Sequence, residues 1–537
     1  MRPCAHSRRR LSTGEGRRTL SVLPVPAERA RGRSIGTAGE TMVAEVAGSE
    51  AEPPPVASPA PRERPERPNV DRKARLLLEP NLPARQPPEV RTANWEETFH
   101  LFDPETAKAE AMRCIQCPAA PCQVACPVGN DIPASFWLLE QGDFDGAANV
   151  FRETSELPEM CGRLCPQERL CEGHCVVGKK GEPVAIGKLE TFVTEWQLAN
   201  GNPPPATIAP ATGKSLAIIG SGPAGIGVAE RVARSGHRVV VYDAWPIAGG
   251  LLHYGIPSFK QNKASVAARI ERLRDLGVEF VLGVRVGEDV AFEELERDFD
   301  AVFVAAGAIE GVALGLEHED APGVYQATEF LVRGNLPPED LPEHLREPLP
   351  ALSSVVVIGG GDTSMDCVRT AVRLGAEEVR LVYRRTEQEM QGREEERMHA
   401  HEEGVIFEFL TAPTAILVDG EGAFRALRCQ LMELGEPDES GRARPVPIRG
   451  SRFEIEADAL VLAIGYNVED GWGEVAPAVR RDPWGRFTVD PRTMRTNRPG
   501  VFAGGDDVNG ADLVVTALAD AHIAAASIEE WLGGGDW

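Results

Sequence analysis

The stretch Ser215–Asp243, SLAIIGSGPAGIGVAERVARSGHRVVVYD, contains the order of elements that decides the fold. It reads as an apolar strand, a glycine turn, an amphipathic helix and a second strand that ends in an acid. The spacing Gly220-x-Gly222-x-x-Gly225 suits a dinucleotide, because these glycines permit a tight turn, close approach of the pyrophosphate and helix–strand packing. Asp243 is placed to accept a hydrogen bond from a ribose hydroxyl.

A second stretch of this kind spans 354–390, SVVVIGGGDTSMDCVRTAVRLGAEEVRLVYRRTEQEM, and its turn is G-x-G-x-x-S from Gly359. Its second strand ends in Arg384 and Arg385 instead of an acid. A guanidinium pairs bidentately with a 2′-phosphate, which an acid would repel. The pattern therefore predicts a preference for NADPH over NADH, although two arginines after a strand can also be plain solvated surface.

Two such units in one chain predict a flavoprotein with a nicotinamide domain inserted. AVFVAAG (301–307) and ALVLAIG (459–465) are typical of buried strands at the crossings between the two nucleotide domains. GVFAGGDDVNG (500–510) places Asp506 after a strand and before a helix. That position resembles the carboxylate that bonds the flavin ribityl chain in this flavoprotein class; the alternative is a helix cap.

Cysteines are concentrated in one region: eight of the eleven lie in 114–175. Their runs, CIQCPAAPCQVACP and CGRLCPQERLCEGHC, lack the paired short clips of most zinc sites. Four-cysteine runs and a Cys-Pro ending are ferredoxin-like, and in two-cluster ferredoxins the fourth cysteine of a run serves the other cluster. We therefore expect two interleaved iron–sulfur clusters that exchange electrons with a flavin, with zinc and a purely structural cluster as alternatives.

Composition excludes several classes of protein. The 537 residues are 42% hydrophobic and carry a net charge of −25, which argues against nucleic acid or an anionic membrane as a partner. No apolar run is long enough to span a bilayer. A secreted disulfide scaffold is normally a short chain with an apolar signal segment, so reduced, metal-bearing thiols in a cytoplasmic protein are expected.

The chain divides by composition. The first residues are Arg-rich like a transit peptide, but a true start at Met42 is the preferred interpretation, which leaves Cys4 without a role. A Pro-rich segment at 201–212 and another at 336–350 are predicted to be a linker and the entry into the insert. The predicted fold is α/β, with 1–90 disordered or linker, 91–205 a helical iron–sulfur domain, 206–350 the first segment of the FAD-binding domain, 351–465 the NADPH-binding domain, and 466–537 the second segment of the FAD-binding domain.

Several motifs together resemble one family. CIQC…PC…CPVGNDIP, CGRLCP…CEGHC, GSGPAG, GGLLHYGIP (249–257), GGGDTSMD and YRR are similar to the small (beta) subunit of NADPH-dependent glutamate synthase. They are equally similar to the large subunit of bifurcating ferredoxin:NADP oxidoreductase and to the N-terminal half of dihydropyrimidine dehydrogenase. The resemblance covers roughly residues 90–537 and implies electron transfer from NADPH through FAD to two [4Fe-4S] clusters.

The resemblance also implies which residues bind the cofactors. The implied FAD residues are Gly220, Ser221, Gly222, Pro223, Ala224, Gly225, Asp243, Gly250, Leu251, Gly505 and Asp506, and the implied NADPH residues are Gly361, Asp362, Thr363, Arg384 and Arg385. The chain departs from the family at Asp243, where Glu is usual, and at Met390–Gly392, where MPA is usual. No residue is assigned a catalytic role.

In the related enzymes one cluster has a non-cysteine ligand on the helix after the second cysteine run, and Glu190 stands there. The implied ligand sets are Cys114, Cys117, Cys122 and Cys175 for one cluster, and Cys126, Cys165, Cys171 and Glu190 for the other. Cys161 is then a neighbouring thiol that binds no iron. The alternatives are that all eight cysteines bind and that Glu190 is an exposed helix charge.

The family implies a partner. The chain shows neither a glutaminase nor a barrel that reduces 2-iminoglutarate, so glutamate synthesis would need a large subunit in a hetero-oligomer. The alternative is a ferredoxin:NADP oxidoreductase subunit that passes electrons to ferredoxin or a second flavoprotein, and nothing in the sequence separates the two. A disulfide reductase is disfavoured because Cys367 has no nearby cysteine for a redox pair, and a cluster-binding scaffold without activity is a further alternative.

Overall fold

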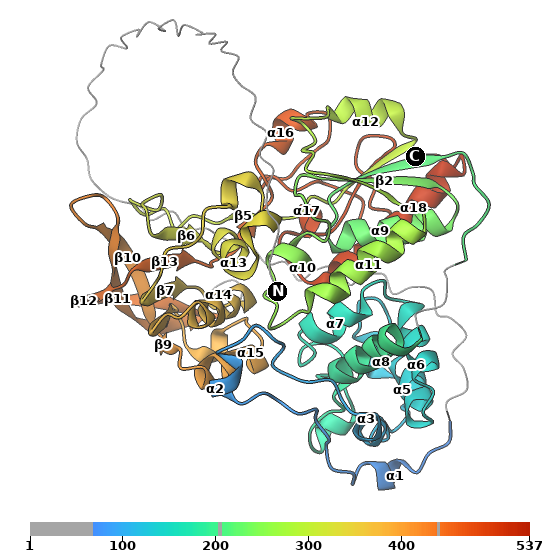
Figure 1. Cartoon of the computed structure of the whole chain (residues 1–537), viewed down its shortest axis with the longest axis horizontal. Helices are drawn as coiled ribbons and strands as arrows, with labels where there is room; N and C mark the ends of the chain where they lie inside the picture. Colours follow the sequence, from blue (N-terminus) through green and yellow to red (C-terminus); the bar gives the residue numbers. More distant parts are fainter. Residues whose placement is uncertain (1–67, 202–206, 438–440) are drawn as a thin grey trace, which may run out of the picture. The chain divides into compact units, whose positions relative to one another are not determined.

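The computed structural model of the chain describes residues 68–201, 207–437 and 441–537. Residues 1–67 of the segment predicted to be disordered or linker (1–90), with the start at Met42, lie outside the described residues, as do residues 202–206 of the predicted linker at 201–212. Within the described residues the chain is α/β, with a helical region followed by two separate five-stranded sheets, which confirms the predicted fold class (Figure 1).

Residues 68–90 belong to the segment 1–90 that was predicted to be disordered or linker, whereas the structure places helices in them. They include α1 (Arg72–Arg75), from which Arg75 pairs with Glu140 at 2.7 Å and donates to the Cys114 carbonyl at 2.8 Å. They continue into α2 (Pro88–Arg91), whose last residue is fully buried. Specific ion pairs anchor this segment, and its proline-rich composition gives no sign of them.

Short capped helices form the cysteine-rich region. Asp103, Asp131 and Asp143 each accept a hydrogen bond from a backbone N–H in the first turn of the helix that follows. Prolines occupy the first helical positions, where the missing N–H costs nothing. The helices are α3 (Pro104–Ala111), α4 (Pro121–Val124), α5 (Ile132–Glu140), α6 (Phe144–Arg152), α7 (Pro158–Leu164), η1 (Val177–Lys179) and α8 (Ile186–Asn200).

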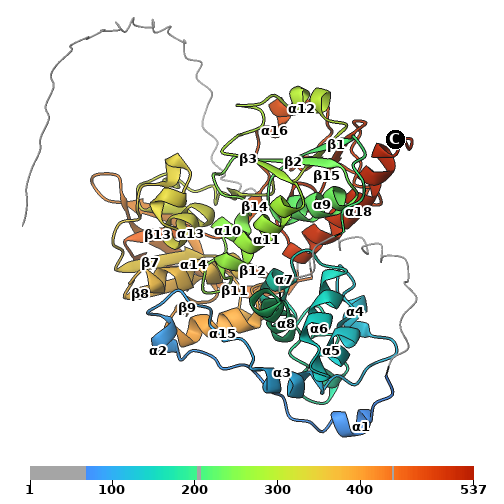
Figure 2. The same ribbon diagram turned by 45° about the vertical axis from the view of Figure 1, so that its right-hand side comes forward.

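The first sheet contains both strands of the stretch Ser215–Asp243. Its order is β15-β4-β1-β2-β3, all parallel, with β1 (Ser215–Ile219) at the centre. Figure 2 labels β1, β2, β3 and β15 of this sheet. Apolar residues cover both faces of this sheet, as a buried parallel sheet requires. The other elements are α9 (Pro223–Arg234), β2 (Arg238–Asp243), α10 (Leu251–Tyr254), α11 (Lys263–Asp275), β3 (Glu279–Leu282), α12 (Phe292–Asp298), β4 (Ala301–Val304), α16 (Trp472–Val475), β15 (Val501–Ala503), α17 (Asp506–Asn509) and α18 (Val514–Leu532).

The second sheet, ordered β6-β13-β7-β8-β9, is also parallel. Its edge strand β6 (Val324–Gln326) and helix α13 (Ala327–Asn335) precede 336–350, so the predicted entry into the insert at 336–350 was wrong. The remaining elements are η2 (Pro338–Asp340), η3 (Glu343–Leu345), β7 (Ser354–Ile358), α14 (Asp362–Arg373), β8 (Glu378–Val382), η4 (Glu387–Glu389), α15 (Glu394–Glu402), β9 (Ile406–Glu408) and β13 (Ala459–Leu462).

Two smaller sheets complete the described portion of the chain. β10 (Thr411–Val418), β11 (Phe424–Pro437) and β12 (Ala443–Glu456) form an antiparallel sheet that packs on the second parallel sheet. The two connections between the nucleotide-binding units pair as β5 (Glu310–Gly311) and β14 (Tyr466–Asn467). The chain therefore crosses between the units directly after β4 and β13, as the buried strands predicted.

One buried arginine joins three regions of the chain. Arg369 on α14 pairs with Glu396 at 2.5 Å and with Glu403 at 2.9 Å. It also donates to the Thr98 hydroxyl at 2.9 Å and lies over the Phe259 ring at 4.5 Å. The two glutamates come from the insert, Thr98 from the N-terminal segment (here residues 92–103, between α2 and α3), and Phe259 from the first nucleotide-binding unit.

We expect Arg369→Ala to lower the free energy of unfolding by about 3 kcal/mol or more, because it leaves two carboxylates buried with less positive charge. Arg380→Ala is the control, since its carboxylate partners are partly exposed, and it should cost about 0–1 kcal/mol. The measurement is the denaturant midpoint of the full chain. Equal midpoints for the two variants would contradict a structural role for Arg369.

Candidate functional site

The first glycine turn has the geometry that its sequence predicts. Gly220 has φ 101°, and a Cβ there would lie 2.1 Å from the Ala305 carbonyl oxygen. A Cβ on Gly225 would lie 2.0 Å from the Gly220 carbonyl oxygen, so this glycine lets helix α9 sit close to the turn. A Cβ on Gly222 would meet open space, which leaves the backbone there accessible to a ligand.

A cavity of about 520 Å³ opens at this turn. It is bordered by Asp362 and Thr363 from the start of α14 in the insert, and by Leu164 from the cysteine-rich region. Its volume is in the range of cofactor sites. The predicted FAD residues that line it are Gly220, Ser221, Gly222, Pro223, Ala224, Asp243, Gly250, Leu251, Gly505 and Asp506.

Asp243 lies in the wall of this cavity, at the end of β2, and accepts hydrogen bonds from Ser221 and Trp245. Its Oδ2 accepts hydrogen bonds from Ser221 N at 2.8 Å and from Ser221 Oγ at 2.5 Å, and its Oδ1 accepts from Trp245 N at 2.9 Å. Ser221 Oγ in turn accepts from Gly249 N at 2.9 Å. The acid therefore orders the glycine turn as well as facing the cavity.

A second group of acids lies around α17. Asp506 lines the cavity, and burial raises its pKa to about 7. Burial raises the pKa of Asp507 to about 8, although its Oδ2 accepts from Gly307 N at 2.9 Å. Asp520 accepts from Gly505 N at 2.9 Å, and burial raises its pKa to about 6. Because Asp506 faces the cavity, a ligand hydroxyl could bind it there.

Asp507 predicts a pH dependence of stability. Its folded pKa of about 8 lies above its ordinary value of 3.8, so the folded chain keeps a proton that the unfolded chain has lost. Stability is then lost as pH rises towards the folded value. We expect the thermal midpoint to fall less steeply between pH 6 and pH 8 in Asp507→Asn than in the wild type, since these limits match the raised values.

Asp419→Asn is the control, because hydrogen bonds lower the pKa of that exposed acid and it should leave the pH dependence unchanged. A slope in Asp507→Asn identical to that of the wild type would mean that Asp507 is already ionised in the folded chain.

The second glycine turn is close-packed on one side and open on the other. A Cβ on Gly359 would lie 2.2 Å from the Ala463 carbonyl oxygen, whereas one on Gly361 would meet open space. The two predicted arginines at the end of β8 differ: Arg384 is exposed, whereas Arg385 is buried and its Nε donates to the Ala443 carbonyl at 2.9 Å. Neither arginine lines the large cavity.

The cysteines form two groups. Cys114, Cys117, Cys122 and Cys175 line one small cavity among apolar residues. Burial raises the pKa of Cys114 to about 12 and of Cys122 further, so these thiols stay protonated until a metal displaces the protons. This set matches the first ligand set implied by the resemblance.

The second group of cysteines contains Cys161 and lies beside Glu190, the two alternative ligands for one cluster. Cys126, Cys165 and Cys171 lie near Glu190, and Cys161 forms a hydrogen bond with Cys165. Glu190 is 6% exposed, so the alternative of an exposed helix charge was wrong. Its Oε1 accepts from Asn130 Nδ2 at 3.2 Å. Among the described residues, no three His, Cys, Asp or Glu side chains form a set that could hold a single metal ion.

Two residues of the large cavity were missed by the sequence reasoning. Lys260 and Asp366 both line it, and they form an ion pair at 2.7 Å between the two nucleotide-binding units. Asp366 lies four residues after Asp362 on α14, a spacing that puts both side chains on one helix face. This spacing could have suggested Asp366 as a residue of the site. Lys260 follows the GGLLHYGIP stretch but has no motif of its own.

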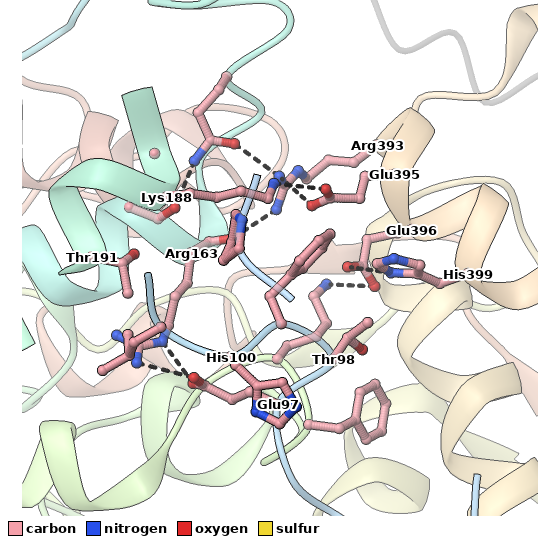
Figure 3. A pocket seen from close by; sticks show the side chains of 18 of the residues that line it. Glu97, Thr98, His100, Arg163, Lys188, Thr191, Arg393, Glu395, Glu396 and His399 are labelled. Atoms are coloured by element: carbon pink, nitrogen blue, oxygen red, sulfur yellow. Dashed lines mark hydrogen bonds and ion pairs between the residues drawn. The ribbon is translucent and has the colours of Figure 1, made fainter. Parts of the chain in front are cut away.

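A second cavity, of about 80 Å³, lies where the cysteine-rich region meets the insert (Figure 3). Lys188 of α8 pairs with Glu395 of α15 at 2.8 Å, and Arg393 donates to the Gln167 side chain at 2.8 Å. Arg163 pairs with Glu97 at 2.6 Å. The Lys188–Glu395 ion pair and the Arg393–Gln167 hydrogen bond therefore join the insert to the cysteine-rich region, whereas the Arg163–Glu97 pair lies within residues 91–205.

Two family models match the chain. The family described as pyridine nucleotide-disulphide oxidoreductase matches residues 214–521, and dihydropyrimidine dehydrogenase domain II, 4Fe-4S cluster, matches residues 91–202. Fold and sites thus define an oxidoreductase of the pyridine nucleotide-disulphide class joined to a 4Fe-4S domain. The second match favours an iron–sulfur domain over the zinc alternative.

Similar proteins of known name identify the family more closely than the two family models do. The glutamate synthase [NADPH] small chain of Escherichia coli is 40% identical over 84% of this chain and 96% of its own length. That of Halomonas elongata is 39% identical over 84% and 96%. The chain therefore belongs to the family of glutamate synthase [NADPH] small chains, which confirms the resemblance seen in the sequence.

A solved structure supports the fold alone. FprA from Mycobacterium tuberculosis matches 60% of this chain and 85% of its own length with a TM-score of 0.51 and 22% identity. Among the described residues, no helix is both long and apolar enough to cross a membrane.

Proposed function

We propose that this chain is the electron-input subunit of a glutamate synthase, which passes electrons from NADPH through FAD and two [4Fe-4S] clusters to a large subunit. The observation that carries the proposal is that one cavity touches all three functional regions. The first glycine turn, the start of α14 after the second turn, and Leu164 beside Cys165 all border it.

The residues of the first unit fit FAD. The open space at Gly222 and the start of α9 suit the pyrophosphate, because free N–H groups and the helix dipole favour anions there. Asp506 is placed to accept a hydrogen bond from a polyol hydroxyl. When bound, a flavin takes a hydride from a nicotinamide and returns electrons one at a time, which is how a cluster accepts them.

The insert fits NADPH at the same cavity. Asp362 and Thr363 border the cavity from the helix that follows the second glycine turn. Lys260 and Asp366 join the two units across the cavity at 2.7 Å, which keeps the two nucleotide sites adjacent. The exposed guanidinium of Arg384 at the end of β8 supports a 2′-phosphate contact.

The two cysteine groups suit a path away from the cavity. The group of Cys126, Cys165 and Cys171 is adjacent to it through Leu164. Cys171 is near enough to Cys122 for the charge of one to raise the pKa of the other, so the two groups are neighbours. We assign the cluster with Glu190 to the position beside the cavity, and the four-cysteine cluster to the position beyond it.

The function is tested with purified chain. We expect NADPH, in the presence of ferricyanide, to be oxidised by the chain alone, and glutamate to form from glutamine and 2-oxoglutarate only when a glutamate synthase large chain is added. Asp506→Ala should weaken FAD binding about tenfold, since it removes a hydrogen bond to a carboxylate. Flavin per chain, measured by absorbance, reports the loss.

Asp298→Ala, at an exposed acid on α12, is the matched control and should retain its flavin. Full flavin content in Asp506→Ala with unchanged turnover would refute the FAD assignment. Reduction of a ferredoxin, with no glutamate formed beside any large chain, would replace the glutamate synthase partner with the alternative one.

The ligand assignment predicts a contrast between Cys161 and Glu190. Cys161→Ser should keep the iron content and the EPR signals of both clusters, whereas Glu190→Ala should change one cluster only, because a carboxylate donates differently from a thiolate. Cys367→Ser is the control, a buried thiol of the insert core away from both groups. Loss of a cluster in Cys161→Ser with no change in Glu190→Ala would show that all eight cysteines bind.

A further inference from the structure

The hairpin formed by β11 and β12 rests on the end of β8. Arg385 is 4% exposed, and its Nε donates at 2.9 Å to the carbonyl of Ala443, the first residue of β12. Ala443 pairs with Pro437 in the outermost register pair of the hairpin. Arg442 therefore stands just beyond the last pair, next to a residue held by Arg385.

Three arginines act electrostatically on one tyrosine at this point. The positive charges of Arg385, Arg442 and Arg384 each act to lower the pKa of Tyr383, against the larger effect of burial, which raises it. Electrostatic effects fall with distance, so Arg442 lies in the same neighbourhood as the two arginines of β8. The hairpin thus adds a third arginine, Arg442, near the position where the sequence motif predicts only Arg384 and Arg385.

The Tyr383 side chain, which follows β8, packs against the second glycine turn. A Cβ on Gly360 would lie 2.4 Å from the Tyr383 ring, and the Tyr383 hydroxyl donates to the Glu389 carbonyl at 2.8 Å. In a parallel nucleotide-binding sheet, ligands bind at the carboxyl ends of the strands, and β8 ends here. The adenosine ribose of a bound dinucleotide is expected at this edge.

We propose that Arg442 is a specificity-determining residue for NADPH, which contacts the 2′-phosphate from the hairpin side while Arg385 holds the hairpin in place. This inference rests on the proposed function, since it assumes that the insert binds NADPH. A phosphate dianion offers several acceptor oxygens, and the planar guanidinium fork matches two of them at once. Arg384 would then approach the phosphate from the loop after β8, and Arg442 from the residues just before β12.

The strand offers a matched control. Arg444 lies two residues after Arg442, inside β12, and carries the same charge, but it is not among the charges that act most strongly on Tyr383. Replacing either arginine changes the net charge equally. A difference between the two variants therefore reports position and not overall attraction.

The test is calorimetric binding of 2′,5′-ADP and of 5′-AMP to the full chain with its flavin. We expect Arg442→Ala to weaken 2′,5′-ADP about tenfold or more, as does Arg384→Ala, with 5′-AMP unchanged. Arg444→Ala should stay within about twofold of the wild type. Arg442→Lys should fall between wild type and Arg442→Ala, because an ammonium keeps the charge and loses the fork.

Three outcomes would contradict the proposal, and they are distinguishable. If the wild type does not prefer 2′,5′-ADP to 5′-AMP, the NADPH assignment fails and the role of Arg442 fails with it. If the wild type shows the preference, but Arg442→Ala and Arg444→Ala bind 2′,5′-ADP equally, only the role of Arg442 is overturned. A loss of 5′-AMP binding equal to that of 2′,5′-ADP would mean that Arg442 supports the hairpin and not the phosphate.

Discussion

A fully buried guanidinium must be paired on every side, and Arg369 meets that constraint with groups from three regions of the chain. Glu396 and Glu403 come from the insert, Thr98 from the N-terminal segment, and the Phe259 ring from the first nucleotide-binding unit. Desolvation of these charges is costly unless all partners are in place. The relative position of the insert and the flavin unit is therefore tied to a short segment that precedes both.

The large cavity depends on that position. Its walls come from separate units, so a shift of one unit against the other would open it. Lys260 and Asp366 repeat the constraint at the cavity itself, and Lys188 with Glu395 repeats it between the cysteine-rich region and the insert. Charge pairs across unit boundaries thus act together with an apolar core that the units share, which includes Leu157, Met160 and Leu216, to hold the walls of the cavity in place.

The sequence predicted what lies within one local stretch. The glycine turn at Gly220 follows from a strand, a turn and a helix in series, and the chain folds as they indicate. What was missed depends on contacts between distant residues. Strand β6 is too short to recognise, and its place beside β13 is set by a partner more than a hundred residues away. The role of Lys260 likewise depends on Asp366 of the second unit, and the burial of Arg385 depends on the hairpin that contains Ala443. Neither contact can be read from the local sequence. The ligand sets, by contrast, came from family resemblance, and the structure groups the cysteines without choosing between Cys161 and Glu190.

The small ladder of β5 and β14 has a consequence for how such a chain can change. Gly311 faces Tyr466 and Glu310 faces Asn467, so the chain departs from the flavin unit and returns to it at neighbouring points. Segments whose ends are adjacent are the ones that folds accept as insertions. The residues between the two strands can thus be exchanged as one unit. If they were removed, a short turn could join β5 to β14, and the first sheet would keep its own strand order. Evolution could in this way alter which nucleotide feeds the flavin without redesigning the protein around it.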